Sequence, residues 1–194
     1  KVNGMLGVHC ENGDLVDELI QSYVSQGKLT PHYHPLSRPA AGEAEAVARY
    51  LMIAEMADLS VNIVHLSTKR SLEAVERARQ RGQSVYVETC PQYLLLDDHL
   101  YDAPNFEAAK YVCSPPLRKR EDHQALWQGN KEGAINTIST DHCSFNFHGQ
   151  KTVGKDDFSK IPNGMPGVET RPELIYTEGV AKGRITLEKM VALL

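Results

Sequence analysis

Four times along this chain, a short apolar stretch is followed by a segment with the spacing of an amphipathic helix. The apolar stretches predict strands at residues 5–8, 61–65, 84–87 and 134–139. Strands that alternate with helices are typical of a parallel sheet, because the chain needs a long crossover to reach the start of the next strand. The sequence therefore predicts an α/β fold with helices packed outside a parallel sheet.

The helices between these strands have start and stop signals in the sequence. The first helix follows a turn at Asn12-Gly13, has Asp14 as its capping candidate and ends at Gly27. Further helices are expected at about residues 42–59, 69–81 and 121–131, and a long loop at residues 145–169 precedes the last. The linker "KLTPHYHPLSRPA" carries three prolines, so it cannot be helical throughout.

Four strand–helix units correspond to half of an eightfold barrel, and a half barrel has open edges. A doubly wound open sheet also fits the pattern, although no G-x-G-x-x-G follows any of the strands, which disfavours a dinucleotide-binding version. The chain begins at Lys1, enters a strand almost at once and closes on the amphipathic "LEKMVALL". These ends suggest a fragment of a longer protein, here called the parent protein.

Composition narrows the choice of partners and compartment. The formal net charge is −4 and no basic block with interleaved aromatics is present, so we expect no nucleic-acid partner. No apolar run approaches the roughly 20 residues that a membrane helix needs, and no leader resembles a secretory signal. The cysteines lie far apart without a C-x-x-C pair, which indicates free thiols and a cytoplasmic location. They are Cys10, Cys90, Cys113 and Cys143.

Polar side chains follow the predicted strands at the points where the strands end, namely His9, His65, Glu88 and Asp141. Parallel α/β folds place their sites at these carboxyl ends. Two imidazoles and one carboxylate form a ligand set that suits zinc or a similar divalent ion. A cation would also offset the cost of burying the Asp141 carboxylate beside a strand end. His9, His65 and Asp141 are therefore candidate metal ligands.

Each of these residues also has a simpler structural interpretation. A lone histidine at a strand end is more often a hydrogen-bonded core or loop residue than a ligand. Asp141 alone fits a turn or a helix cap. Their shared position at strand ends is what favours metal binding.

The remaining histidines and thiols are expected to be structural. His142 should point away from its neighbour Asp141, and Cys143 is interpreted as a buried thiol rather than a nucleophile. Cys90 and Cys113 are interpreted in the same way. The linker histidines could form a surface metal pair, but exposed loop residues are favoured, and three others are expected at the surface. The linker pair is His32 and His34, and the other three are His99, His123 and His148.

Seven segments resemble the dihydropyrimidinase and D-hydantoinase family of the amidohydrolase superfamily. In chain order they are "VHCENGDL", "SRPAAGEAEAVAR", "VHLS", "VETCPQYLLLD", "AKYVCSPPLR", "STDHCSFNF" and "DFSKIPNGMPGVETR". They occur in family order and cover nearly the whole chain. The separations between His9, His65 and Asp141 also match the family.

The resemblance implies a metal-dependent (β/α)8 TIM barrel, of which residues 1–194 would be a partial catalytic domain with strands five to eight. His9 and His65 would bind the more exposed metal ion, and Asp141 would bind the buried ion and carry protons. Ser114 and Asn163 would hold the cyclic amide through backbone groups. The cofactors would be two divalent ions, with zinc expected, bridged by a carboxylated lysine that lies upstream of this chain, together with an H-x-H pair.

The function that the resemblance implies is hydrolysis of the cyclic amide of dihydropyrimidines or hydantoins. Metal-activated hydroxide would attack, and Asp141 would pass its proton to the ring nitrogen. The substrate would be a small cyclic ureide or imide, and the parent protein a cytoplasmic homotetramer without nucleic-acid or membrane partners. The isolated chain would be inactive, because the upstream ligands are missing from it.

Two alternatives stay open. Allantoinase and dihydroorotase share the metal barrel, but a dihydroorotase must bind a ring carboxylate with basic side chains. The "SRP" segment offers Arg38, but the family pattern disfavours Arg38 as a substrate clamp. The "ETCPQY" and "SPPLR" contexts favour dihydropyrimidinase or hydantoinase. A non-enzymatic, collapsin-response-mediator-like scaffold would depart from the ligand set, whereas His9, His65 and Asp141 all remain in this chain.

Overall fold

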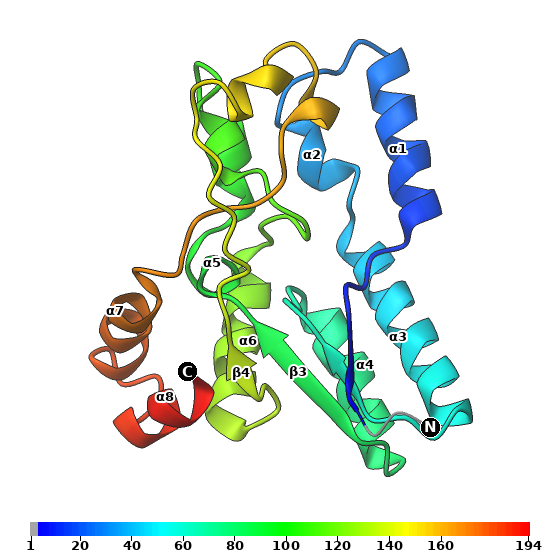
Figure 1. The fold of residues 1–194 in the computed structure, drawn as a ribbon, viewed down its shortest axis with the longest axis vertical. Coiled ribbons are helices and arrows are strands. Elements are labelled where there is room, and N and C mark those ends of the chain that lie inside the picture. Colours follow the sequence, from blue (N-terminus) through cyan, green and yellow to red (C-terminus); the bar gives the residue numbers. More distant parts are fainter. Residues whose placement is uncertain (1–3) are drawn as a thin grey trace.

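The computed structural model describes residues 4–194, and within them four parallel strands form one sheet in the order β1-β2-β3-β4 (Figure 1). The strands are β1 (Leu6–Val8), β2 (Val61–Ile63), β3 (Val85–Thr89) and β4 (Thr137–Ile138). Leu6 pairs with Val61, Val61 with Val85, and Glu88 with Thr137. The predicted α/β fold and parallel sheet are confirmed, and β4 is shorter than predicted because Ile135 is still tied to the preceding helix by a hydrogen bond to Gly129 O.

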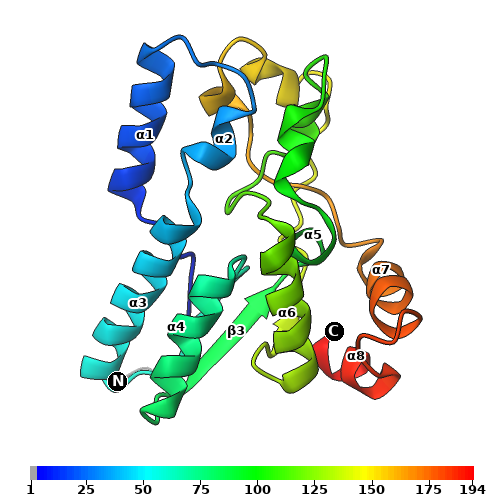
Figure 2. The same ribbon diagram turned by 180° about the vertical axis from the view of Figure 1, so that it is seen from behind.

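The helices are α1 (Gly13–Ser25), α2 (Tyr33–Leu36), α3 (Ala40–Met56), α4 (Lys69–Gln80), α5 (Pro91–Leu95), α6 (Arg120–Glu132), α7 (Arg171–Ile175) and α8 (Leu187–Leu193). Helices α3, α4 and α6 lie side by side on one face of the sheet (Figure 2). Within the described residues, no helix covers the other face, which is turned to the viewer in Figure 1. Consecutive strands that are neighbours, with their helices on one face, favour a singly wound sheet over a doubly wound one.

Side-chain caps explain where helices α1 and α4 begin. The cap of α1 is Asn12, whose side chain accepts a hydrogen bond from Leu15 N at 3.1 Å. The expectation that Asp14 is the cap is wrong, because Asp14 already lies in the first helical turn. Thr68 caps α4 in the same way through Ser71 N at 3.1 Å, which fixes the turn that follows β2.

The core lies between the sheet and the helices behind it. Its buried members include Val61, Val85, Val87, Val47, Leu51, Val75, Leu126 and Ile138. Each such side chain contributes about 1.5–3 kcal/mol relative to an exposed position. On α3, Val47 and Leu51 are buried in this core, whereas Ala48 is exposed.

The sheet has open edges in the described part of the chain. β1 lies at one edge, where Leu6 is 54% exposed, and the adjacent helix α3 exposes Met52, Ile53 and Met56. Apolar side chains are thus exposed both at this edge of the sheet and on the neighbouring helix. None of the helices in residues 4–194 combines the length and the apolar character needed to cross a membrane.

Candidate functional site

The ends of β1 and β2 bring two of the predicted ligands together. Val8 pairs with Ile63, so the residues that follow these strands emerge at the same edge of the sheet. His9 Nδ1 lies 3.0 Å from His65 Nε2, and the two ring centroids are 4.7 Å apart. Residues 56 positions apart in the sequence thus place two ring nitrogens face to face.

Burial makes His65 a neutral nitrogen donor. Its side chain is only 7% exposed, and its Nδ1 is buried without a hydrogen-bond partner. Burial lowers the pKa of His65, and a protonated His9 would lower it further, while the charge of Asp141 opposes both. Two facing nitrogens, one of them on a ring that burial keeps neutral, are a donor set that divalent metals such as zinc prefer.

Asp141 lies close enough to act electrostatically on His65, but it stands apart from the pair. Within residues 4–194, the three potential ligands His9, His65 and Asp141 do not place their donor atoms within 4.8 Å of one another. Asp141 is exposed and follows the end of β4. Both His65, at φ 40°, and Asp141, at φ 47°, adopt the left-handed backbone that non-glycine residues seldom use. Such strained positions cluster at functional sites.

A buried carboxylate holds the second nitrogen of His9. His9 Nε2 lies 3.0 Å from Glu11 Oε2, which also accepts a hydrogen bond from Arg38 Nη1 at 2.8 Å. Burial raises the pKa of Glu11, but the hydrogen bond with His9 and the charge of Arg38 outweigh it and hold the pKa below its usual 4.5. A carboxylate at Nε2 favours the tautomer whose lone pair is on Nδ1, the atom that faces His65.

This ion pair also bears on the alternative role for Arg38. Its guanidinium is engaged by Glu11, whose side chain is only 5% exposed. A carboxylate clamp for a substrate needs a free guanidinium, so the arrangement favours a structural role for Arg38. The sequence pattern did not reveal Glu11, although a carboxylate two residues after a candidate ligand was a usable signal.

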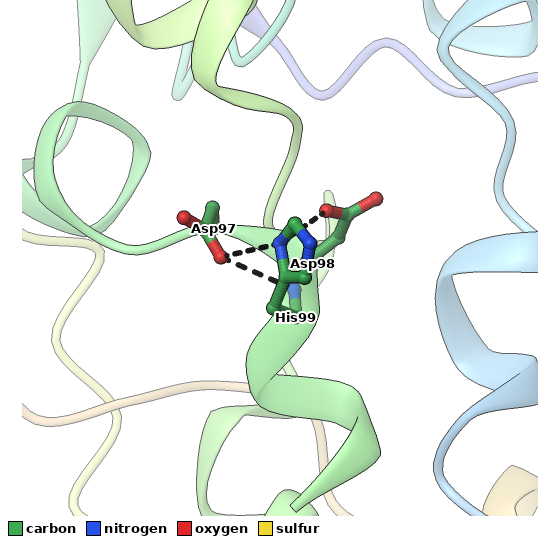
Figure 3. Close-up of side chains that lie close together, drawn as sticks. All are labelled: Asp97, Asp98 and His99. Carbon is green, nitrogen blue, oxygen red and sulfur yellow. Dashed lines mark hydrogen bonds and ion pairs between the residues drawn. The ribbon is translucent and has the colours of Figure 1, made fainter.

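Asp97, Asp98 and His99 form a separate cluster (Figure 3). Their donor atoms lie within 4.8 Å of one another, but the His99 side chain is 80% exposed. Asp97 pairs with Arg120 at 3.0 Å and Asp98 with Lys119 at 3.1 Å. Because neighbouring cations already balance both carboxylates, we interpret the cluster as an ion-paired surface turn.

The segments that carry Ser114 and Asn163 also meet. Gly164 N donates to Val112 O at 3.0 Å, which joins the "PNG" segment (residues 162–164) to the residue just before the "CSPPL" segment (residues 113–117). Ser114 is half-buried with an unpartnered Oγ, and Asn163 is exposed. The structure therefore brings together the two segments to which the resemblance assigned substrate contacts.

Several secondary expectations are corrected by the structure. His34 is 3% exposed and donates from Nε2 to Cys113 O at 2.8 Å, so its interpretation as an exposed loop residue is wrong. The linker turns inward as α2, which a proline-rich sequence does not reveal. His123 is half-buried rather than exposed, and Cys143 is half-buried rather than buried.

Other secondary expectations are confirmed. Cys90 and Cys113 are buried, and His99 and His148 are exposed. His142 faces solvent and accepts hydrogen bonds at Nδ1 from Gly167 N at 3.1 Å and Val168 N at 3.2 Å, which fixes the loop that follows the "PNG" segment.

His34 gives a prediction for the pH dependence of stability. Burial lowers its pKa from 6.5 to about 4. The unfolded chain therefore binds a proton at higher pH than the folded chain, and stability is lost as the pH falls from about 6.5 to about 4. The loss expected from this group is about 3 kcal/mol. Chemical denaturation of the parent protein across this range measures it.

His34→Gln is the matched variant, because glutamine can still donate to Cys113 O but does not titrate. We expect its stability to fall less than that of the wild type over this pH range. His148→Gln, at an exposed histidine, is the control and should behave as the wild type. Equal pH dependence in His34→Gln and the wild type would contradict the assignment.

Comparison with known proteins shows close relatives over almost the whole chain. The chain is 47% identical over 193 residues to a D-hydantoinase of Ralstonia pickettii, which covers 100% of this chain and 42% of that protein. It is 44% identical over 191 residues to a D-hydantoinase of Geobacillus stearothermophilus, covering 98% of this chain and 41% of the relative. No protein-family model matches the chain.

Solved structures show the same relationship. A D-hydantoinase from Bacillus sp. AR9 superimposes with a TM-score of 0.97 at 44% identity, covering 98% of this chain and 41% of that one. A dihydropyrimidinase from Brevibacillus agri NCHU1002 gives a TM-score of 0.97 at 43% identity, with coverage of 98% and 41%. The chain thus spans about two fifths of the length of the proteins that it matches.

Proposed function

Since the chain belongs to the D-hydantoinase and dihydropyrimidinase family of amidohydrolases, we propose that its parent protein hydrolyses the cyclic amide bond of dihydropyrimidines or hydantoins. The observation that carries this proposal is the facing pair of His9 Nδ1 and His65 Nε2 at 3.0 Å. This pair supplies the imidazole donors that a metal-dependent hydrolase needs. The relatives of the chain are D-hydantoinases and a dihydropyrimidinase, which are cyclic amide hydrolases.

We further propose that residues 1–194 are strands five to eight of a (β/α)8 barrel with their helices, forming part of one catalytic domain. Three observations support this: the strands are parallel and neighbours in sequence order, the helices α3, α4 and α6 cover one face, and the relatives are more than twice as long. The open edge at β1 would be covered by the rest of the parent protein.

The residues present fit a divalent metal. His9 Nδ1 and His65 Nε2 face each other at 3.0 Å at the strand ends, and His65 Nδ1 is buried without a hydrogen-bond partner. His9 and His65 would hold one ion, and Asp141 would contribute to a second together with upstream ligands, including a carboxylated lysine. Zinc is the ion favoured by this donor set. When bound, such ions activate water and polarise the ring carbonyl.

Residues of this chain would then transfer the proton, orient the ring and position the metal ligands. The Asp141 carboxylate is exposed at the strand end, where it can accept the proton of the attacking water and deliver it to the departing ring nitrogen. Backbone groups of Ser114 and Asn163 would orient the ring, which lowers the entropic part of the barrier. Glu11 would keep the His9 ring in its orientation.

The parent protein is further proposed to be a cytoplasmic homotetramer that takes a small cyclic ureide or imide and neither nucleic acid nor membrane. The four free cysteines and the net charge of −4 support the compartment and the absence of a nucleic-acid partner. The exposed apolar side chains of α3, such as Met56 at 85%, support burial of this helix in a larger assembly.

Assays of the purified parent protein against four rings test the function. We expect turnover of dihydrouracil or hydantoin, and little of allantoin or dihydroorotate. A preference for dihydroorotate or allantoin would replace the proposal with the corresponding cyclic amidohydrolase. No turnover of any ring by a protein that also fails to bind zinc when zinc is supplied would favour the non-enzymatic scaffold.

A further inference from the structure

Lys151 is a buried lysine in the loop that follows Asp141. It opens a 3₁₀ turn at Lys151–Gly154 and is only 3% exposed. Its Nζ donates to Val112 O at 2.7 Å, to Pro162 O at 2.6 Å and to Gly164 O at 2.8 Å. The Phe145 ring lies on another side of the ammonium, 5.6 Å from Nζ to the centroid.

These contacts use every donor that the side chain has. An ammonium group carries three N–H donors, and here each reaches a backbone carbonyl. Burial lowers the pKa of Lys151 to about 8, so the charged form with three donors still dominates at pH 7. Burying an ammonium group without hydrogen-bond partners is costly. The three hydrogen bonds of Lys151 therefore stabilise the conformation of this loop.

The three carbonyls belong to the two segments expected to contact substrate. Val112 lies two residues before Ser114, and Pro162 and Gly164 flank Asn163 on either side. Lys151 therefore spans both segments with one group, at a point where their backbones are also joined by the Gly164 N to Val112 O bond.

The "PNG" segment is also locked against the residues after Asp141. Gly164 has φ +136°, and a Cβ added to it would lie 2.4 Å from Cys143 Cβ, so only glycine fits. The next residue, Met165, accepts a hydrogen bond from Cys143 N at 3.0 Å. Movement of this segment would therefore displace both the proposed substrate contacts and the residues that follow Asp141 at the end of β4.

We propose that Lys151 is a positioning residue that fixes the backbone groups of Ser114 and Asn163 at the separation needed to hold a cyclic amide. The inference rests on the proposed function. Removing the ammonium leaves three carbonyls without their donor and frees the two segments to move apart. Contacts made equally in the ground state and the transition state then weaken, which raises KM more than it lowers kcat.

Lys151→Met in the parent protein tests this, with Lys155→Met as the matched control at an exposed lysine of the same loop. With dihydrouracil or hydantoin, we expect KM to rise about tenfold or more and kcat to fall less than about threefold in Lys151→Met. Lys155→Met should have the KM and kcat of the wild type. The thermal midpoint of each variant is measured alongside, because a purely structural lysine would change the midpoint without changing KM.

Lys151→Arg is the second variant, in case the methionine variant does not fold. A planar guanidinium keeps the charge but cannot reach three carbonyls arranged around a tetrahedral ammonium, so KM should still rise. An unchanged KM in either folded variant overturns the inference while the wild-type activity upholds the proposed function. Failure of both variants to fold also overturns it, because the lysine is then needed for folding itself. A wild type without activity on any ring overturns both proposals.

Discussion

Replacing Asp141 with alanine in the parent protein is expected to lower kcat by about 10³-fold or more. The residue follows the last strand in a left-handed backbone conformation, and its charge acts on His65. Alanine removes both a proposed metal ligand and the group proposed to move a proton from water to the leaving nitrogen. Steady-state kinetics with the ring that the wild type prefers measures the loss.

Asp156→Ala is the control for this experiment, because Asp156 is an exposed aspartate of the loop downstream. It should retain nearly the full kcat. Near-normal turnover by Asp141→Ala would show that Asp141 is not the proton carrier. Another group would then have to transfer the proton.

The second large effect is expected at the buried ion pair between Arg118 and Glu43. Arg118 Nη2 lies 3.1 Å from Glu43 Oε2, and the two side chains are 5% and 2% exposed. Arg118 also donates to Ser67 Oγ at 3.0 Å and to Arg38 O at 2.6 Å. Glu43 in turn accepts hydrogen bonds from Ser67 N and Thr68 N, each at 3.2 Å. The pair thus connects α3 with the segments that follow His65 and Ser114.

Arg118→Met is expected to destabilise the parent protein by about 3–5 kcal/mol, because it leaves the Glu43 carboxylate buried without its counter-ion. Chemical denaturation measures the change. The double variant Glu43→Gln with Arg118→Met should lose less than the sum of the two single variants, since no uncompensated charge is then buried. Arg120→Met is the matched control, at an 81% exposed arginine that pairs with Asp97, and should cost less than about 1 kcal/mol. A similar small cost for Arg118→Met would contradict the buried-pair interpretation.

The regular part of the fold was predictable from local pattern. Strand β2 and helix α4 formed within a few residues of their predicted bounds, because apolar spacing and the Thr68 cap act within one or two turns of chain. His9 and His65 could be paired in advance because parallel strands share an edge. The resemblance to the family supplied the substrate class, which spacing alone could not.

Burial of polar side chains in loops was not predictable. Lys151 and His34 lie in segments whose composition is that of surface loops, yet both are 3% exposed. Their burial depends on carbonyl acceptors from other parts of the chain, namely Val112 and the "PNG" segment for Lys151, and Cys113 for His34. Helix α5 was also missed, because a five-residue helix is too short to show a periodicity.

The metal content of the parent protein tests the proposed site most directly. Wild type, His65→Ala and, as an exposed control, His148→Ala would be stripped with a chelator, reloaded with zinc, dialysed and measured by elemental analysis. We predict about two zinc ions per chain in the wild type and the control, and the loss of at least one in His65→Ala. Full metal content in His65→Ala would contradict a metal held by His9 and His65.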